Sequence, residues 1–311
     1  MRVAVLKGGS SLERGISLRS AARVEDALEG LGHEALGIDV GRDLVRRLRE
    51  ERPDVVFIAL HGPGGEDGTV QELLEILGLP YTGPGVAACA ICMDKVAAKH
   101  ALRAAGLPTP DWAAFNDTAF RELGAADTLE EIEERLGFPL VVKPASQGSS
   151  LGVKFASERG EVPEALVNAF SYDSRVLLER FVEGRELAVS ILGSEPLPTV
   201  EAIPHESDAY DFEARYEIGR TTFVCPADLG DADSSAVTEA AVRAYETLGC
   251  SGFSRVDLML GSDGPQVLEV NAIPGLTNTS LLPQAAEAAG IQFEQLVERM
   301  LELALERSAV V

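Results

Sequence analysis

Arg2-Val3-Ala4-Val5-Leu6 begins the stretch of sequence that decides the fold of this chain. It is a short, mostly apolar segment, which predicts a strand buried on both faces. A helical apolar pattern follows and ends at Gly32, and further strands are expected at 34–39 and 54–60, with a helix at 42–51 between them. Strands that alternate with helices form a parallel sheet, so the first part of the chain is predicted to be an α/β domain.

Two glycine-rich loops follow the first and third of these strands, Gly8-Gly9-Ser10-Ser11 and the segment from His61 to Thr69. The carboxyl ends of parallel strands open onto loops, and ligands usually bind there. We therefore expect part of a ligand site on these two loops.

The remainder of the chain has a different pattern. A helix at about 94–105 precedes a helix at 128–136 and a strand that ends at Lys143, which together predict an α+β module. Long strands then lead to two closing helices, around 281–289 and 292–307. These changes predict three domains, an N-terminal α/β domain at 1–95, a central α+β domain at 96–178 and a C-terminal domain at 179–311.

The charge balance limits the partners of this protein. Fifty acidic residues against 27 basic ones give a formal net charge of −23 at pH 7, and such a surface repels phosphate backbones, so no nucleic-acid partner is expected. No apolar segment is long enough to cross a membrane, and the N-terminus reaches Lys7 too early for a signal peptide. We expect a cytoplasmic protein with no membrane partner.

The cysteine pattern predicts neither a disulfide framework nor a zinc site. Cys89 and Cys92 make one CxxC pair without a second pair at zinc spacing, and they lie in an alanine-rich segment. We interpret them as small buried helix residues. The neighbouring segment from Gly83 to Ala88 is similar to a dinucleotide-binding fingerprint, but it lacks the acidic residue expected downstream, so we interpret it as the turn into that helix. No GxxxxGK[ST] phosphate loop is present.

Lysine is rare among the basic residues. The five lysines are Lys7, Lys95, Lys99, Lys143 and Lys154. Because arginine serves wherever a cation only solvates the surface, each lysine is a candidate for a specific role. Lys143 ends a predicted strand, and Gly148-Ser149-Ser150 follow in the next loop. Glycine lets a backbone approach phosphate and serine donates hydrogen bonds to it, so this loop is a candidate phosphate site, whereas the alternative is an ordinary hairpin with a surface lysine.

Two alternating segments near the C-terminus bring oxygen ligands together. Alternation places Arg255 and Asp257 on one face of the first segment, and Glu269 and Asn271 on one face of the second. A three-residue turn at 262–264 would put Asp257 opposite Glu269 and Arg255 opposite Asn271, with residue 261 paired to 265. Two carboxylates and an amide oxygen suit Mg²⁺, and a salt-bridged solvent face is the alternative. Strongly apolar neighbours favour the metal site: Val256, Leu258, Val267 and Val270.

The sequence resembles the D-alanine–D-alanine ligases of the ATP-grasp superfamily over essentially its whole length. The matching segments, in order and at near-family spacing, are Gly8 to Arg14 with Ser17-Leu18, His61 to Thr69, Met93-Asp94-Lys95, Val142-Lys143-Pro144 with Gly148-Ser149-Ser150, Tyr210 to Tyr216, Arg255-Val256-Asp257, and Glu269-Val270-Asn271 with Pro274 to Thr277 and Ser280-Leu281. Each segment alone is a weak signal, but the ordered set is specific. The resemblance implies an α/β, three-domain ATP-grasp architecture with an N-terminal parallel sheet. It also implies ATP-dependent ligation of two D-alanine molecules through an acyl phosphate, for peptidoglycan precursor synthesis.

The resemblance also implies a role for each matching position. The ATP-binding residues would be Lys95, Lys143 and Arg215 at the phosphates, Glu179 and the backbone near Val182 at the adenine, and Glu186 at the ribose. Two Mg²⁺ ions, or Mn²⁺ in their place, would be held by Asp257, Glu269 and Asn271. The D-alanine-binding and catalytic residues would be Glu13, His61, Ser149, Tyr216, Arg255, Gly275, Ser280 and Leu281. A homodimer is implied as well.

Two positions depart from the family pattern. Arg215 stands where the family usually has lysine, and arginine keeps the charge but is larger and forked. Lys7 stands where an apolar residue is common, and it is expected either to pair with Glu13 or Glu66 or to reach solvent.

Three rival functions remain at this point. One is a related ligase whose second substrate is D-lactate, D-serine or another amine, against which Tyr216 favours D-alanine. The others are a nucleotide-binding oxidoreductase built on the N-terminal sheet and an inactive binding module. The complete set of cations, metal ligands and carboxylates argues against both.

Overall fold

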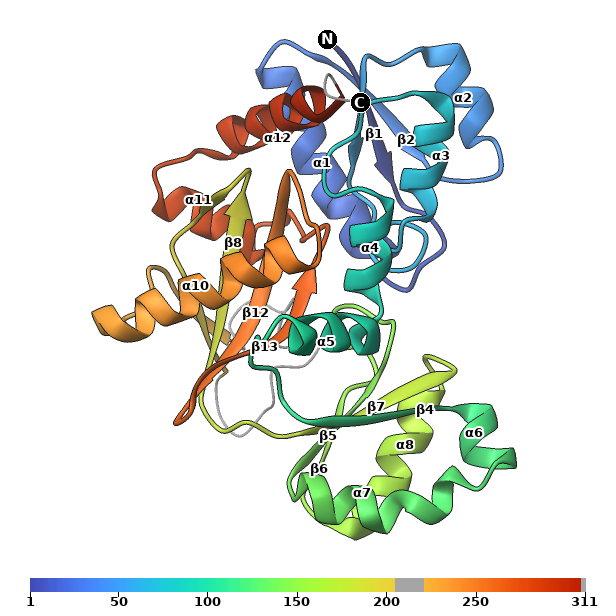
Figure 1. Ribbon diagram of the computed structural model, residues 1–311. Helices are drawn as coiled ribbons and strands as arrows, with labels where there is room; N and C mark the ends of the chain where they lie inside the picture. Colours follow the sequence, from blue (N-terminus) through green and yellow to red (C-terminus); the bar gives the residue numbers. More distant parts are fainter. Residues whose placement is uncertain (205–220, 309–311) are drawn as a thin grey trace.

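The computed structural model describes residues 1–204 and 221–308, and these residues form three sheets. Figure 1 shows a small parallel sheet at the top, a large antiparallel sheet in the middle and a second antiparallel sheet at the bottom of the molecule. The three sheets follow one another along the chain in the order top, bottom, middle. The chain therefore passes through the bottom sheet before it returns to the centre of the molecule.

The N-terminal sheet has three parallel strands in the order β2–β1–β3, which confirms the prediction of a parallel sheet. Its elements are β1 (Arg2–Lys7), α1 (Arg14–Gly30), β2 (Glu34–Asp39), α2 (Leu44–Glu51), β3 (Val55–Ile58) and α3 (Thr69–Leu77), and α4 (Val86–Met93) and α5 (Lys95–Ala104) follow them. In β1, Ala4 and Leu6 pack in a core shared with α2 and α3, whereas Val3 and Val5 pack in a core shared with α1. The strand is buried on both faces, as its apolar sequence predicts.

The second sheet along the chain is called the central sheet because it belongs to the central part of the sequence, and it lies at the bottom of Figure 1. It is antiparallel, in the order β4–β7–β5–β6. Its elements are β4 (Trp112–Asn116), α6 (Asp117–Glu122), α7 (Leu129–Leu136), β5 (Leu140–Pro144), β6 (Lys154–Ala156), α8 (Val162–Phe170) and β7 (Arg175–Arg180). Leu140 and Val142 of β5 pack against α7 and α8 on one face. Lys143, one residue further along the strand, belongs to the other face and lines a cavity there.

The large sheet has β11–β10–β8–β12–β13 in order, with the short β9 paired to β8. Its elements are β8 (Arg185–Leu192), β9 (Glu195–Pro196), β10 (Val200–Pro204), β11 (Thr221–Val224), α10 (Asp231–Thr247), β12 (Phe253–Gly261) and β13 (Gly264–Asn271). Val256 and Leu258 of β12 share a core with Val237 and Ala241 of α10. Helix α10 therefore covers one face of this sheet, and the polar residues of β12 lie on the other face.

The hairpin between β12 and β13 differs from the prediction in one respect. Gly261 pairs with Gly264, not with residue 265, so the turn holds two residues instead of three. An irregularity then shifts the register between Leu258 and Asp257, and Leu268 is the additional residue on β13. The shorter turn changes the register by one residue, and the additional residue Leu268 changes it back by one. Asp257 therefore still lies opposite Glu269. The predicted pairing is confirmed, although the predicted turn is wrong.

The last two helices, α11 (Leu281–Ala288) and α12 (Phe293–Ser308), connect the large sheet to the N-terminal one. Leu296 and Met300 of α12 share a core with Val24 and Leu28 of α1, and Figure 1 shows the two helices side by side. Arg307 strengthens this connection because its guanidinium donates to the Tyr81 carbonyl at 2.9 Å. The C-terminal helix thus packs on the N-terminal domain.

Helix α4 contains the two cysteines of the CxxC pair. It begins at Val86 after the cap residue Gly85, so the glycine-rich segment before it is a helix-entry turn, as interpreted. Cys89 and Cys92 are buried free thiols, and Cys92 Sγ lies 3.6 Å from Cys250 Sγ. The interpretation of buried helix cysteines is confirmed.

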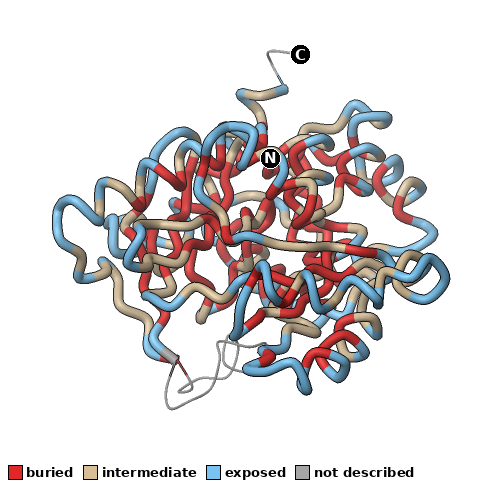
Figure 2. Tube along the Cα trace, turned by 60° about the horizontal axis from the view of Figure 1, so that its bottom comes forward, coloured by how far each residue is buried: buried red, intermediate tan, exposed pale blue. Residues whose placement is uncertain are grey.

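Buried residues follow the strands and the inner sides of the helices, and exposed residues gather at the outer turns (Figure 2). Among residues 1–204 and 221–308, none of the helices could span a lipid bilayer.

Candidate active site

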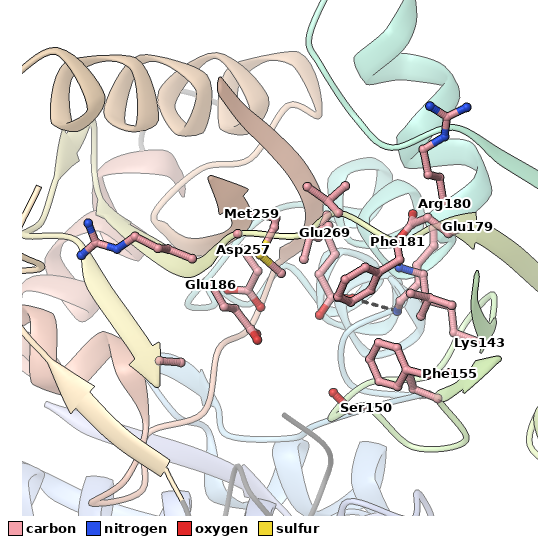
Figure 3. A pocket seen from close by; sticks show the side chains of 18 of the residues that line it. Lys143, Ser150, Phe155, Glu179, Arg180, Phe181, Glu186, Asp257, Met259 and Glu269 are labelled. Carbon is pink, nitrogen blue, oxygen red and sulfur yellow. Dashed lines mark hydrogen bonds and ion pairs between the residues drawn. The ribbon is translucent and has the colours of Figure 1, made fainter. Parts of the chain in front are cut away.

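A cavity of about 870 Å³ lies between the central sheet and the large sheet (Figure 3). The central sheet contributes Lys143 and Phe155 to its wall, and the large sheet contributes Glu186, Asp257 and Glu269. Pockets for ligands of moderate size commonly have volumes of about 300–1,000 Å³. The cavity is therefore large enough for a nucleotide.

Lys143 is a cation on the central-sheet side of the cavity. Its Nζ lies 2.7 Å from Oε1 of Glu179 on β7, and Oε2 of the same carboxylate lies 2.5 Å from Lys99 Nζ. Burial disfavours the ionised carboxylate, but the positive charges of Lys143 and Lys99 outweigh burial and hold the pKa of Glu179 below its ordinary value. Glu179 is therefore a buried carboxylate between two ammonium groups.

Lys95 is the first residue of α5. Asp94 caps this helix because its side chain accepts two backbone N–H groups of the first turn. Lys95 Nζ donates to the Gln147 carbonyl at 2.7 Å and lies 3.0 Å from Glu269 Oε2. Lys95 therefore connects the loop after β5 with the metal-ligand candidates of the large sheet.

The predicted metal ligands converge on one face of β12 and β13. Arg255 donates from Nε and Nη2 to the two oxygens of Asp257, at 2.6 and 2.7 Å. Asn271 Nδ2 donates to Asp257 Oδ2 at 3.0 Å, and Glu269 lies directly opposite Asp257. The structure therefore brings together all four residues that the alternation placed on this face.

Glu13 and Ser149, both among the D-alanine-binding and catalytic residues that the resemblance implies, are in contact. Ser149 Oγ donates to Glu13 Oε1, and Ser149 has the left-handed φ of 52°. A Cβ atom at Gly148 would lie 2.7 Å from Glu13 Oε2, so glycine permits this close approach. Burial raises the pKa of Glu13, and the charge of Glu66 raises it further, against the lowering effect of the Ser149 hydrogen bond.

His61 is buried near Glu13. Its Nδ1 lies 3.1 Å from Glu66 Oε1, and its Nε2 lies 3.0 Å from Ser20 Oγ. Burial opposes the protonated ring, but the hydrogen bond and charge of Glu66, with the charge of Glu13, outweigh it and raise the pKa of His61. Ser20 Oγ also accepts the Leu276 backbone N–H at 3.2 Å, so His61 is linked to the loop that contains Gly275.

That loop packs tightly before α11. Ser280 is the residue that precedes the helix, which begins at Leu281. Ser280 Oγ accepts the Thr277 backbone N–H at 3.0 Å, and a Cβ atom at Gly275 would lie 2.9 Å from the same oxygen. The N–H groups at the start of a helix form a favourable site for an anion, such as a carboxylate.

The remaining residues predicted for the site fall into two groups. Val182 and Glu186 line the cavity together with Glu179. Tyr216 and Arg215 lie outside the described residues.

Lys7 does not follow either sequence-based expectation. Its Nζ lies 2.6 Å from Glu25 Oε1 on α1, and not beside Glu13 or Glu66. Because β1 packs against α1, the side chain at the end of the strand meets a helix carboxylate, and it remains partly exposed beside it.

Four side chains at or behind the cavity wall have no role predicted from the sequence. Phe155, Phe181 and Met259 line the cavity, and Lys99 contacts Glu179 from behind it. Met259 shares a face with Arg255 and Asp257 by alternation, so its position could have been predicted once that face was chosen. Phe155 and Phe181 form a T-shaped pair with centroids 5.8 Å apart. They come from β6 and from the segment after β7, and no local pattern indicates that these segments meet.

Comparison with known proteins identifies the family. The family model described as the C-terminus of D-ala D-ala ligase matches residues 101–302, and the model of its N-terminus matches residues 43–84. The chain belongs to the D-alanine–D-alanine ligase family. A D-alanine–D-alanine ligase from a Synechococcus species is 46% identical over 100% of this chain and 95% of its own length. One from Moorella thermoacetica is 45% identical over 98% of this chain and 100% of its own.

Solved structures of the ligase family have the same fold. The D-alanine–D-alanine ligase from Bacillus anthracis matches with a TM-score of 0.87 at 35% identity, covering 100% of this chain and 99% of that one. The Bacillus anthracis ligase in complex with ATP matches with a TM-score of 0.85 at 34% identity over the same shares of the two chains. The three-domain ATP-grasp architecture expected from the sequence is therefore confirmed as the fold class.

Proposed function

We propose that this protein joins two D-alanine molecules into D-alanyl-D-alanine at the expense of ATP. The observation that carries this proposal is the convergence of Lys143, Lys95 and the Asp257–Glu269 pair on the cavity, with Glu13 and Ser149 in contact nearby. Family membership supports the same reaction, because full-length relatives are D-alanine–D-alanine ligases. The product serves as a peptidoglycan precursor.

ATP is proposed to occupy the cavity between the two antiparallel sheets. The ATP complex of the Bacillus anthracis ligase supports this nucleotide. Lys95 and Lys143 would hold the phosphates, and Glu179 with the backbone near Val182 would bind the adenine. Glu186 would accept hydrogen bonds from the ribose hydroxyls. Arg215 would add a further phosphate contact, as its position in the family pattern implies.

The oxygen ligands on β12 and β13 fit Mg²⁺. Asp257 and Glu269 supply carboxylates, and Asn271 donates through Nδ2 to Asp257, so its amide oxygen is its remaining acceptor. Hard oxygen ligands of this kind prefer Mg²⁺ and accept Mn²⁺. We propose that the three residues hold two such ions. When bound, the ions supply positive charge to the transferring phosphoryl group.

The two D-alanine molecules are proposed to bind beside the cavity. Glu13, held by Ser149 and near His61, would bind the ammonium group of the first molecule. The N-terminus of α11, with Ser280 and Leu281, would bind the carboxylate of the second. Tyr216 would close the site through Ser149 and Glu13.

The reaction requires an activated carboxylate, because a free carboxylate is a poor electrophile. ATP would phosphorylate the first D-alanine to an acyl phosphate and leave ADP. The free amine of the second would then attack the carbonyl carbon, and the tetrahedral species would lose a proton and expel phosphate to form the peptide bond. The oxyanion of the tetrahedral species would be stabilised by Arg255 and the Gly275 N–H. A closed site would exclude water, which otherwise hydrolyses the acyl phosphate.

We further propose the three-domain division 1–95, 96–178 and 179–311 and a homodimer in the cytoplasm. Neither a nucleic acid nor a membrane is proposed as a partner, since the formal net charge of −23 disfavours polyanions. The proposed second boundary falls within β7, so Glu179 and Arg180 extend the central sheet slightly beyond it.

A panel of D-amino acids and D-hydroxy acids tests the proposed function. Each acceptor is supplied with ATP, Mg²⁺ and D-alanine, ADP release is measured, and the products are identified by mass spectrometry. We expect D-alanyl-D-alanine to dominate. A larger yield of the D-alanyl-D-lactate ester or of a mixed dipeptide would contradict the proposal and favour the related-ligase alternative.

A further inference from the structure

Lys99 is a buried cation to which neither the sequence motifs nor the proposed reaction gives a role. It lies on α5, one turn after Lys95, and its side chain is fully buried. Its Nζ lies 2.5 Å from Glu179 Oε2, donates to Thr109 Oγ1 at 2.6 Å and donates to the Pro110 carbonyl at 3.1 Å. Three acceptors therefore hold this ammonium group in one place.

The charges around Glu179 form a buried series of cation, anion and cation. Lys143 contacts one carboxylate oxygen at 2.7 Å, and Lys99 contacts the other. Lys143 and Glu179 both line the nucleotide cavity, whereas Lys99 lies behind them and does not. Without Lys99, the Lys143–Glu179 pair would have no net charge, because the carboxylate would neutralise the ammonium group. With Lys99, the three groups carry a net charge of +1 beside the cavity.

We propose that Lys99 is a positioning residue for the nucleotide: it orients the Glu179 carboxylate and balances its charge, so that Lys143 and Glu179, with Lys99 behind them, present a net charge of +1 to the triphosphate. This inference rests on the proposed function and names how the phosphates of ATP are recognised. Burial in low-dielectric surroundings strengthens the coupling between the three groups relative to a similar arrangement in water.

Lys99→Met tests the proposal by removing the charge from this buried position. Lys154→Met is the matched control, since it removes one lysine charge from an exposed position on β6 of the same domain. Equilibrium binding of ATP, inorganic tripolyphosphate and adenosine is measured by competition with a fluorescent nucleotide. We expect Lys99→Met to weaken the binding of ATP and of tripolyphosphate by on the order of tenfold, as loss of one nearby charge predicts. The binding of adenosine should weaken much less. The KM for D-alanine should stay unchanged, and the control should bind all three probes as the wild type does.

The double variant Lys99→Met/Glu179→Gln extends the test. Removing the carboxylate restores a net charge of +1 through Lys143, so tripolyphosphate should bind more tightly to the double variant than to Lys99→Met. A purely structural role of Lys99 predicts no such recovery. Thermal unfolding of each variant shows whether it is folded under the binding conditions.

The wild type offers a second measurement that needs no substitution. Burial lowers the pKa of Lys99 to about 8. The charge of Glu179 opposes this decrease, whereas the charges of Lys143 and Arg103 add to it. ATP binding favours the protonated lysine, so the affinity for ATP should be highest below pH 8 and should weaken as the pH rises from 8 to 9. A phosphate group titrates near pH 6, so ATP itself changes little in that range.

Each outcome decides between clear alternatives. If wild type fails to bind ATP, the proposed function is wrong. If wild type binds ATP but Lys99→Met binds ATP and tripolyphosphate equally well, the inference alone is wrong. Weakened binding confined to adenosine, or an ATP affinity of wild type that is flat from pH 7 to 9, would also overturn it.

Discussion

Asp257 on β12 lies directly opposite Glu269 on β13, and β13 contains one additional residue, Leu268, next to this pair. The turn places Gly261 opposite Gly264, and the bulge at Leu268 then shifts the register so that the two carboxylates are opposite. A bulge also turns its additional side chain toward the same face, and both Leu268 and Glu269 line the cavity. The hairpin therefore presents acidic ligands and an apolar side chain to the same site.

Substitution of either carboxylate should nearly abolish turnover. Asp257→Asn and Glu269→Gln are almost isosteric but remove an anionic ligand, so we expect kcat at limiting magnesium to fall by on the order of 100-fold. The matched control is Asp263→Asn, which makes the same change in the exposed turn of the same hairpin. ADP release is measured over a magnesium titration. Rates like those of wild type at limiting magnesium would rule out the metal assignment.

Glu13→Gln should weaken D-alanine binding and stabilise the fold. A hydrogen bond to a charged group contributes about 1.5–3 kcal/mol, so the KM for D-alanine should rise on the order of tenfold or more. Burial raises the pKa of Glu13, so the native state holds this proton more tightly than the unfolded chain does. The carboxyl therefore contributes stability at low pH that is lost as the pH rises through the raised pKa.

Glutamine is neutral, so at pH 7 the variant avoids the unfavourable free energy of burying an ionised carboxylate. We therefore expect a higher Tm for Glu13→Gln at pH 7 and a smaller difference from wild type at pH 4. Glu29→Gln, at an exposed position of the adjacent helix α1, is the control. A lower Tm for Glu13→Gln at pH 7 would show that the carboxylate stabilises the ligand-free site instead.

The four thiols should react in two classes. Cys89, Cys92 and Cys250 are buried, and Cys225 is partly exposed. The thiolate is the reactive form, and burial raises the pKa of the Cys89 thiol strongly and that of the Cys225 thiol less. A disulfide reagent should therefore modify Cys225 first and the other three only after denaturation. Cys225→Ser should remove the fast phase, and a fast phase that persists would indicate that the α4 region opens.

Tyr216→His should change the choice of acceptor. A neutral phenol adds no positive charge against the ammonium group of the incoming D-alanine, whereas a protonated histidine would repel it. We expect the variant to make less dipeptide and more depsipeptide, most clearly below about pH 6.5, the unperturbed histidine pKa. The measurement is the product ratio with D-alanine and D-lactate in competition at several pH values. Equal ratios for wild type and variant would remove Tyr216 as the selector.

Much of the architecture could be predicted because its signals are local. The alternation of strands and helices predicts the parallel sheet, and the two-residue period places Arg255 and Asp257 on one face. The hairpin between β12 and β13 could not be predicted in full from such signals. The turn length and the bulge at Leu268 both affect the pairing, and in this case their effects cancel. The correct partner for Asp257 was therefore predicted from an incorrect turn.

The sequence by itself determined the order of elements, the family and the residue types available for the site. Only the tertiary structure decided which of them meet. Lys99 and Glu179 are far apart in the chain, and their ion pair exists because α5 packs beside the central sheet. Glu13 reaches Ser149 in the same way, through two loops from different domains. The physical reason is that a periodic pattern specifies the face on which a side chain lies, whereas the partner across an interface depends on the packing of the whole chain.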